Sequence, residues 1–521
     1  MSKHVVIVGG GLAGLAAAVG LAGRPELRVT LCESRPRWGG RASSFVDQTT
    51  GEPIDNCQHV ALGCCTNFRH FCQAIGIESL FCREDELVFV APDGRASRMA
   101  AAPWPAPLHL APAFARFGFL SWHDKYRLGL GLRALARTDP ALCEGVTFLD
   151  WLHRHGQTQT NIDRFWHVVL VSALSETLDR IDVGHARKVF VDAFIANRHG
   201  WEVWLPTAPL DELYGPRLEA WLAARNVTPR LQSGAKQLLF DPGRTNNAAG
   251  SPSSAPAAHA TGVELRSGER IDADEVILAV PQNLVLPLLP EACRAHPRLA
   301  GIDRLETAPI SSVHLWFDRP ITKLRHATFV GKQSQWLFNR SAIQATCAGQ
   351  AGAVERAITD PQPQNHATPP GPPLLRGGEL DSALRTPNSE LHYYQVVISA
   401  SRDVVEAGND QTIRMVVDEL AGVWPIVREA RLVHSRLVTE HKAVVSMLPG
   451  VDKLRPPQQS PIDNLQLAGD WTQTGWPGTM EGAVRSGYLA AENVLRRCGT
   501  PQRLVQSDLP VALLSKLLFG L

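Results

Sequence analysis

A short apolar run followed by three spaced glycines opens the chain, and this feature most narrowly limits how the first residues can fold. Val5 to Val8 are continuously apolar, as a strand buried on both faces requires. Gly9, Gly11 and Gly14 follow in the spacing G-x-G-x-x-G. The first glycine of this pattern allows a tight turn, the second lets the backbone approach a pyrophosphate, and the third lets a helix pack close to the strand. We therefore predict a strand, turn and helix that bind a dinucleotide.

The residues after this turn extend the prediction. A helix over residues 12–21 would direct the N–H groups of Leu12 and Ala13, and the positive end of its dipole, at the phosphates. A second strand over residues 28–32 ends at Glu33, about 20 residues past the glycine turn, where an acidic side chain hydrogen-bonds ribose hydroxyls. We assign Glu33 and the adjacent Ser34 to this part of the site.

A second part of the same site is expected at the other end of the chain. Residues 465–470 have the pattern of a strand that ends in Gly469 and Asp470, and residues 480–487 that of a helix start. A chain that returns near its end to complete a dinucleotide site is typical of a flavoprotein and not of a simple NAD dehydrogenase.

The loop after Glu33 favours FAD as the cofactor. Residues 38–42, Trp-Gly-Gly-Arg-Ala, resemble the GG-R element of the amine oxidase and phytoene desaturase superfamily of FAD enzymes. The resemblance implies that Gly40 lies along the diphosphate and that Arg41 donates to a phosphate or a flavin carbonyl; the alternative is a surface arginine after a turn. It also implies that Asp470 binds the ribityl or phosphate region and that Ala235, within residues 232–238, meets the adenine.

The helix expected at residue 480 completes the FAD site. Its N-terminus would face the pyrimidine carbonyls of the flavin, where the helix dipole stabilises the negative charge of reduced flavin. The residues assigned to this contact are Met480, Glu481 and Ala483.

Three longer segments carry a narrower resemblance. Residues 55–64 (DNCQHVALGC), 205–213 and 468–491 are similar to motifs of the squalene-associated FAD-dependent desaturase family. Cys57 and Gly478 depart from the family's usual Gly and Ala, Cys65 replaces an aromatic residue, and residues 173–177 follow the family's pattern only loosely. Because these departures lie in or near the expected site, they bear on the substrate more than on the fold.

This resemblance implies a reductive reaction on a C30 isoprenoid lipid. Reduced FAD would deliver a hydride to hydroxysqualene, water would leave, and squalene would remain, as a step of squalene and hopanoid biosynthesis. Other squalene-pathway enzymes are expected as partners. Two other functions stay open: a carotenoid or phytoene desaturase-like oxidase, which transfers hydride from lipid to flavin, and a flavin-bound scaffold or lipid carrier without catalysis. An amine oxidase is disfavoured, since its covalent-flavin cysteine and aromatic cage are not recognisable.

The proton donor is predicted less directly. His59 is the first candidate because a histidine titrates near neutrality, and it is expected beside the flavin together with Gln58. The alternative is that His59 only hydrogen-bonds the backbone or the flavin. Glu481 is the second candidate, with the alternative that it caps or orients its helix.

Composition limits the class of protein. The net charge of +1, without a basic run interleaved with aromatics, disfavours a nucleic-acid partner. The chain's N-terminus lacks the features of a signal peptide, and its 10 cysteines include no C-x-x-C pair. We therefore expect a cytoplasmic enzyme with reduced thiols and no metal, peripheral to the inner face of the cell membrane.

The expected fold class is α/β (α+β overall), with a Rossmann-type FAD-binding domain and a discontinuous substrate domain. The FAD-binding domain is expected over residues 1–80, 225–300 and 430–500, the substrate domain over 81–224 and 301–430, flexible insertions over 242–261 and 347–387, and an apolar C-terminal segment over 501–521.

Two segments are candidates for membrane contact. Residues 509–519 are strongly apolar but too short to span a bilayer as a helix. They would lie in the interface as an amphipathic anchor or pack against the protein itself. Residues 114–135, expected to be helical and rich in aromatics, are the other candidate.

Overall fold

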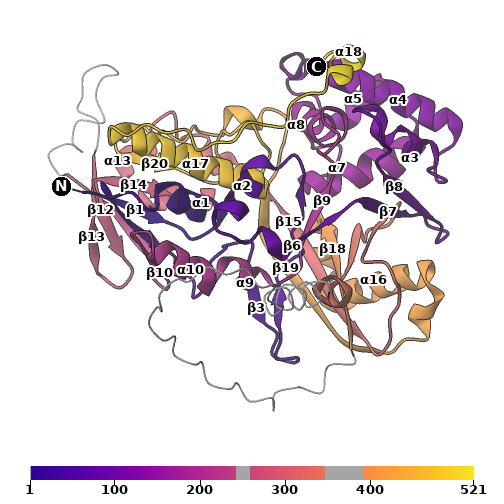
Figure 1. Ribbon diagram of the computed structural model, residues 1–521, viewed down its shortest axis with the longest axis horizontal. Helices are drawn as coiled ribbons and strands as arrows, with labels where there is room; N and C mark the ends of the chain where they lie inside the picture. The colour runs from indigo at the N-terminus through magenta and orange to yellow at the C-terminus, as the bar shows by residue number, and fades with distance from the viewer. Residues whose placement is uncertain (1, 242–258, 346–390) are drawn as a thin grey trace, which may run out of the picture.

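A computed structural model describes residues 2–241, 259–345 and 391–521. Of the segments predicted to be flexible insertions, 347–387 lies wholly outside the described residues, and 242–261 lies outside them except for residues 259–261, where Ala260 starts a strand. Figure 1 shows two bodies side by side, one built on the sheet that contains β1 and one that carries the helices α3 to α8 above a second sheet.

The first body is a parallel sheet assembled from distant parts of the chain. Its strand order is β10-β2-β1-β14-β20. The strands are β1 (Lys3–Val8), β2 (Leu27–Cys32), β10 (Val227–Arg230), β14 (Glu275–Leu278) and β20 (Leu465–Leu467). Central β1 is buried on both faces, as its apolar run predicts. All five strands carry their C-terminal ends to one edge, where ligands of open α/β sheets bind.

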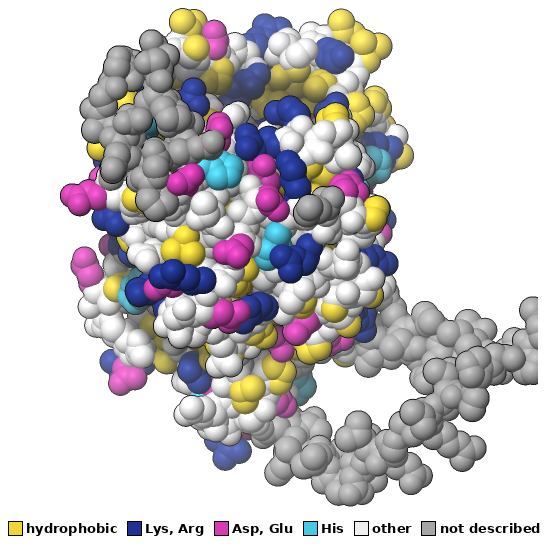
Figure 2. All heavy atoms as spheres, turned by 90° about the vertical axis from the view of Figure 1, so that its left-hand side faces the viewer, with side chains coloured by type: hydrophobic (Ala, Val, Ile, Leu, Met, Phe, Trp, Pro, Cys, Tyr) yellow, Lys and Arg dark blue, Asp and Glu magenta, His cyan; other side chains and the backbone are white. Residues whose placement is uncertain are grey.

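Two helices from opposite ends of the chain cover this sheet. The helix α1 (Leu12–Leu21) has the predicted bounds, and α17 (Met480–Arg497) packs directly against it. A Cβ atom at Gly487 would lie 2.1 Å from the Ala13 carbonyl oxygen, so only glycine allows this close packing. A three-stranded sheet of β11 (Ala235–Phe240), β12 (Ala260–Leu265) and β13 (Arg270–Asp272) completes the body. Figure 2 shows acidic and basic side chains interspersed on this side of the molecule.

The second body contains a seven-stranded sheet in the order β19-β15-β18-β17-β16-β7-β8. Its strands are β7 (Glu86–Val90), β8 (Ala96–Ala100), β15 (Thr307–Phe317), β16 (His326–Phe329), β17 (Trp336–Asn339), β18 (His392–Ser399) and β19 (Leu432–Val445). The long strand β19 pairs with β15, whereas β20 belongs to the parallel sheet. The range 430–500, expected in the FAD-binding domain alone, therefore contributes to both sheets. The helix α16 (Asn409–Val423) covers one face of the larger sheet.

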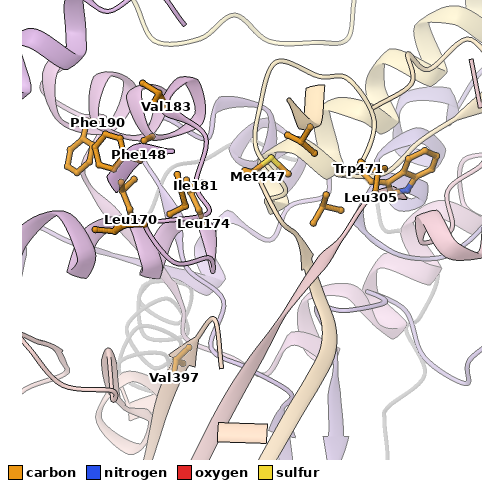
Figure 3. Packing of buried hydrophobic residues seen from close by; sticks show 14 of the residues in the cluster. Phe148, Leu170, Leu174, Ile181, Val183, Phe190, Leu305, Val397, Met447 and Trp471 are labelled. Atoms are coloured by element: carbon orange, nitrogen blue, oxygen red, sulfur yellow. The ribbon is translucent and has the colours of Figure 1, made fainter. Parts of the chain in front are cut away.

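Helices form the rest of the second body. They are α3 (Ala111–Ala115), α4 (Trp122–Arg137), α5 (Phe148–Arg154), α7 (His167–Leu174) and α8 (Val183–Phe190), with π-helical turns η4 (Ile162–Trp166) and η5 (Val191–Ile195). The expected single helical stretch 114–135 is wrong in one respect, because the chain leaves α3 before Phe117 and a capping box of Ser121 and Asp124 starts α4. Figure 3 shows Phe148, Leu170 and Phe190 packed together between these helices.

Short elements connect the two bodies. They include α2 (Thr66–Ala74), α9 (Leu210–Tyr214), α10 (Pro216–Ala223), α12 (Gln282–Leu288) and the strands β3 (Ser44–Val46), β4 (Pro53–Asp55), β5 (Ala61–Leu62), β6 (Phe81–Glu84) and β9 (Val203–Pro206). The C-terminal segment runs back across both bodies and ends in α18 (Leu513–Phe519), which packs on α4. The Ser515 hydroxyl donates to the Ile195 carbonyl, so this segment is packed against the protein itself. Among the described residues, none of the helices has both the length and the apolar character needed to cross a membrane.

Candidate functional site

One cavity of about 750 Å³ runs along the C-terminal edge of the parallel sheet and continues between the two bodies. Of the residues predicted to bind a cofactor, it is lined by Gly9, Gly11, Leu12, Ala13, Glu33, Ser34, Gly40, Arg41, Gln58, His59, Ala235, Gly469, Asp470, Met480, Glu481 and Ala483. The structure thus brings together side chains from both ends of the sequence. Gly14 is the exception, because it lies behind the turn and not at the cavity wall.

The three glycines have different physical roles. Gly9 has φ +111°, and a Cβ there would lie 2.4 Å from the Ala279 carbonyl oxygen. A Cβ at Gly14 would lie 1.8 Å from the Gly9 carbonyl oxygen, so this glycine lets α1 pack against the turn. At Gly11 the nearest described protein atom to such a Cβ is 4.0 Å away, in Gly40. The room beside Gly11 therefore belongs to the cavity, as a site for a pyrophosphate requires.

Glu33 ends β2 beside this turn. Its Oε2 accepts a hydrogen bond from the Gly10 N–H at 2.7 Å, and its Oε1 accepts from the Arg35 N–H and the Ser34 hydroxyl. These bonds hold the carboxylate at the cavity wall, where it would meet a ribose. Ala235 and Lys236 line the same end of the cavity from β11. The residues present therefore fit the nucleotide half of FAD.

Arg41 and Asp470 join the two parts of the site. Arg41 Nη2 lies 2.5 Å from Asp470 Oδ1, and its Nη1 donates to the Ala443 carbonyl oxygen at 2.8 Å. The carbonyl of Asp470 in turn accepts from the buried Arg455. Arg41 is therefore not a free surface arginine but part of the wall where the diphosphate and flavin would lie.

Glu481 ties α17 to α2. Its buried carboxylate accepts hydrogen bonds from the Asn67 side chain at 2.7 Å and from the backbone N–H groups of Asn67 and Phe68 at 3.2 and 2.8 Å. Burial raises the pKa of this carboxyl group, and the donors from α2 oppose that rise. Glu481 thus caps α2, whereas the predicted alternative is that it caps or orients its own helix, α17. Both of its carboxylate oxygens accept hydrogen bonds from α2.

The segment that contains Gln58 and His59 lines the cavity. His59 Nδ1 lies 2.9 Å from the Cys57 carbonyl oxygen, which can only accept, so Nδ1 carries the proton and donates. Burial lowers the pKa of His59 and favours the neutral ring. In this tautomer Nε2 is a hydrogen-bond acceptor.

Arg340, which follows β17 in the second body, holds the segment that contains Gln58 and His59. The sequence motifs did not indicate this arginine. Its guanidinium donates to Gln58 Oε1 at 2.7 Å, to the Pro206 carbonyl at 3.1 Å and to Asp55 Oδ2 at 3.3 Å. The Arg340 and Asp55 side chains are each 2% exposed. A buried carboxylate such as that of Asp55 needs a partner of opposite charge. No local sequence pattern identifies Arg340 as that partner.

The rest of the cavity wall is largely apolar. Its residues include Leu87, Phe89, Val168, Val169, Val189, Phe194, Leu288, Ile310, Phe338 and Val397. Four tryptophans, Trp201, Trp336, Trp471 and Trp476, line the cavity, whereas Trp204 and Trp316 do not. Trp166 is instead buried in the helical core.

The cysteines in the described residues are free, at positions 32, 57, 64, 65, 72, 82, 143, 293 and 498. Within the same residues no cluster of His, Cys, Asp and Glu could hold a metal ion.

Comparison with known proteins identifies the family. The model of the family described as flavin containing amine oxidoreductase matches residues 12–495. The chain belongs to this family. It is accordingly a FAD-dependent oxidoreductase, and its cofactor is FAD.

Relatives and solved structures span the whole fold. The chain is 25% identical to 15-cis-phytoene desaturase of Synechococcus elongatus over 96% of this chain and 97% of the relative. It is 26% identical to zeta-carotene desaturase of Zea mays, over 96% and 84%. An oxidoreductase from Methanosarcina mazei (TM-score 0.64, 15% identity, 93% and 98% covered) and cyclohexylamine oxidase from Brevibacterium oxydans (TM-score 0.61, 17% identity, 96% and 100% covered) share the fold. The amine oxidase-type FAD-binding fold is thereby confirmed.

Proposed function

We propose that this protein transfers hydride between FAD and a polyprenoid lipid, and that its reaction is the reductive dehydroxylation of hydroxysqualene to squalene and water. One observation carries the proposal: the residues assigned to FAD and a mostly apolar wall belong to the same cavity. A cavity of this kind suits a hydrocarbon chain laid against the flavin.

The relatives support the substrate class. Those reported above are named as desaturases of phytoene and zeta-carotene, and they align with nearly the whole chain. They also favour a second candidate function, in which the protein desaturates a polyprenoid and hydride moves from lipid to flavin. The Gln58-His59 segment, which resembles the squalene-associated family, favours the reductive direction.

When bound, FAD supplies the hydride. The chain's own residues must then hold the lipid, exclude water and provide a proton to the departing hydroxyl. Neutral His59, with Nε2 as acceptor, fits orientation of the flavin or the lipid better than proton delivery. His59→Ala should retain FAD and lose turnover; full activity would remove His59 from the mechanism.

An anaerobic single-turnover experiment tests the proposal. Enzyme reduced with dithionite is mixed with hydroxysqualene in detergent, and flavin absorbance and lipid mass are followed. Flavin reoxidation with stoichiometric squalene supports the dehydroxylase. If reduced flavin persists, while phytoene bleaches the oxidised enzyme, the desaturase function replaces it.

The same proposal includes a place of action. We infer a cytoplasmic protein that contacts the inner face of the cell membrane, takes its lipid there and works beside other squalene-pathway enzymes. Exposed apolar side chains on α4 and α18 support this inference, because Trp122, Tyr126, Leu513 and Leu517 are each at least 65% exposed on two adjoining helices.

A further inference from the structure

Most charged residues of the cavity wall have a clear assignment. Glu33, Arg35, Lys236 and Arg266 lie at the nucleotide end, and Arg41 pairs with Asp470. Glu481 caps α2. Glu440 lies on β19, three residues before Ala443, whose carbonyl oxygen accepts a hydrogen bond from Arg41. Lys188 and Asp192 remain, and they face the cavity from the helical wall that the lipid would touch.

These two residues form a close pair on consecutive helical turns. Lys188 lies on α8 and Asp192 on the π-helical turn η5, and the ammonium Nζ lies 2.7 Å from Asp192 Oδ2. Their side chains are 21% and 26% exposed. Their neighbours on the same wall, Val189 and Phe194, are apolar. π-Helical turns are rare in proteins, and those that occur are often found at functional sites.

The pair also lies next to the flavin side of the cavity. Lys188 Nζ lies 4.4 Å from the centre of the Trp476 ring. Trp476 directly precedes the loop 477–479, which lines the cavity and leads into the N-terminus of α17. A polar group bound at Lys188 would therefore be near the reacting end of a lipid.

We propose that Lys188 and Asp192 form the binding site for the hydroxyl group of an oxygenated polyprenoid. This inference rests on the proposed dehydroxylation. The Lys188 ammonium donates a hydrogen bond to the substrate oxygen, and Asp192 holds the ammonium in place. A hydrocarbon such as phytoene or squalene has no group that could replace water around this pair, so its binding here carries a desolvation cost.

The same contact supplies the missing proton. The substrate C–O bond breaks, the oxygen takes a proton from Lys188 and leaves as water, and the hydride supplied by reduced FAD forms the new C–H bond. Lys188 is then a neutral amine. Asp508, whose carboxylate lies 3.9 Å from Lys188 Nζ and is 46% exposed, provides the route by which a proton returns from solvent. His59, an acceptor at Nε2, is not needed for this step.

Ligand binding to the oxidised holoenzyme tests the assignment without turnover. The affinities of hydroxysqualene and squalene in detergent are measured from the perturbation of the flavin spectrum, for the wild type, Lys188→Met and Lys188→Arg. Lys453→Met is the control, because the Lys453 side chain is 67% exposed, pairs with Glu144 and does not line the cavity. FAD content is measured for every variant.

The wild type should bind hydroxysqualene on the order of tenfold more tightly than squalene. Lys188→Met should lose this preference while its FAD content stays unchanged, and Lys188→Arg should keep the preference. A Lys188→Met enzyme with the wild-type preference overturns the site, as does a wild type without preference. If the wild type dehydroxylates hydroxysqualene in the single-turnover experiment, such a result rejects the site alone and leaves the proposed function standing.

Discussion

Arg41 and Asp470, which lie 429 residues apart in the sequence, form an ion pair whose N–O distance is 2.5 Å at the wall of the cavity proposed to hold FAD. Neither residue belongs to a strand or helix; each follows a strand of the parallel sheet. The pair therefore joins the first and last parts of the nucleotide-binding body at the place where the cofactor would lie.

Breaking this pair should weaken FAD binding. We expect Arg41→Met and Asp470→Asn each to lower FAD affinity about tenfold, equivalent to about 1.4 kcal/mol. Because the two side chains act together, the double variant should lose less than the sum of the two losses. Titration of FAD into stripped protein measures this, and unchanged affinity in both single variants would reject the assignment.

Gly11 and Gly14 should respond differently to alanine. Gly14→Ala places a Cβ 1.8 Å from the Gly9 oxygen and should lower the free energy of unfolding by about 3 kcal/mol. In Gly11→Ala the nearest described atom to the new Cβ, apart from its chain neighbours, is Gly40 Cα at 4.0 Å, so the effect on the FAD-free fold should stay within about 1 kcal/mol. The substitution should nevertheless reduce FAD affinity. Denaturant unfolding and flavin content together separate the two effects, and a Gly11→Ala enzyme with wild-type FAD affinity would contradict them.

We expect Glu481 to contribute mainly to the stability of the fold and not to the chemical step. Glu481→Ala leaves the buried donors of Asn67 and Phe68 without an acceptor and should destabilise the protein by about 1–3 kcal/mol. Glu481→Gln retains one acceptor oxygen and should lose less. Thermal unfolding measures both, with the exposed Glu429→Gln as control; equal stability of Glu481→Ala and wild type would show that the cap is dispensable.

Buried histidines should make the fold sensitive to acid. Burial lowers the pKa of His109 and of His326 from 6.5 to about 4. Between these values the unfolded chain binds the proton and the folded chain does not, so stability falls as pH falls, by up to about 1.4 kcal/mol per pH unit for each histidine. Between pH 8 and pH 5, the free energy of unfolding of His109→Leu should therefore fall by about 2 kcal/mol less than that of the wild type. Urea unfolding at both pH values is the measurement, and the exposed His153→Gln should follow the wild type.

The exposed apolar residues of α4 and α18 should govern membrane binding. Trp122→Ser combined with Leu517→Ser should reduce binding to vesicles of anionic phospholipid about tenfold or more, because two apolar side chains no longer enter the interface. Basic residues Arg137 and Lys516 lie on the same two helices and remain. Sedimentation with vesicles measures the effect, with Val405→Ser on α15 (Arg402–Ala407) as the control. Unreduced binding would place the contact elsewhere.

The sequence predicted the parts of the fold whose signals are local. The bounds of α1, the strands around it and the return of β20 and α17 follow from apolar runs and glycine spacing. The assignment of β19 could not be predicted in this way, because a strand's residues do not state which sheet it joins. The start of α4 did have a local signal, the Ser121 and Asp124 capping box, which lies inside the expected helical stretch.

The candidate site likewise contains residues that the sequence could predict and residues that it could not. Glu33, Arg41 and Asp470 stand in recognisable motifs and line the cavity together. Arg340, Lys188 and Asp192 carry no motif, since an isolated arginine or an i, i+4 pair of opposite charges reads as an ordinary surface feature. Lys188 and Asp192 are revealed only by their position at the cavity wall, and Arg340 only by its buried contacts with Gln58 and Asp55.

The strand order β10-β2-β1-β14-β20 has a consequence for biosynthesis. A ribosome releases β1 and α1 first, yet the edge strand β20, which pairs with β14, and the helix α17, which packs on α1, are made more than 400 residues later. The part of the site formed by β1 and α1 therefore lacks the wall contributed by β20 and α17 while the second body is synthesised. FAD can be enclosed only after α17 has been made, and chains that stop before α17 are left with an open cofactor site and an exposed face of α1.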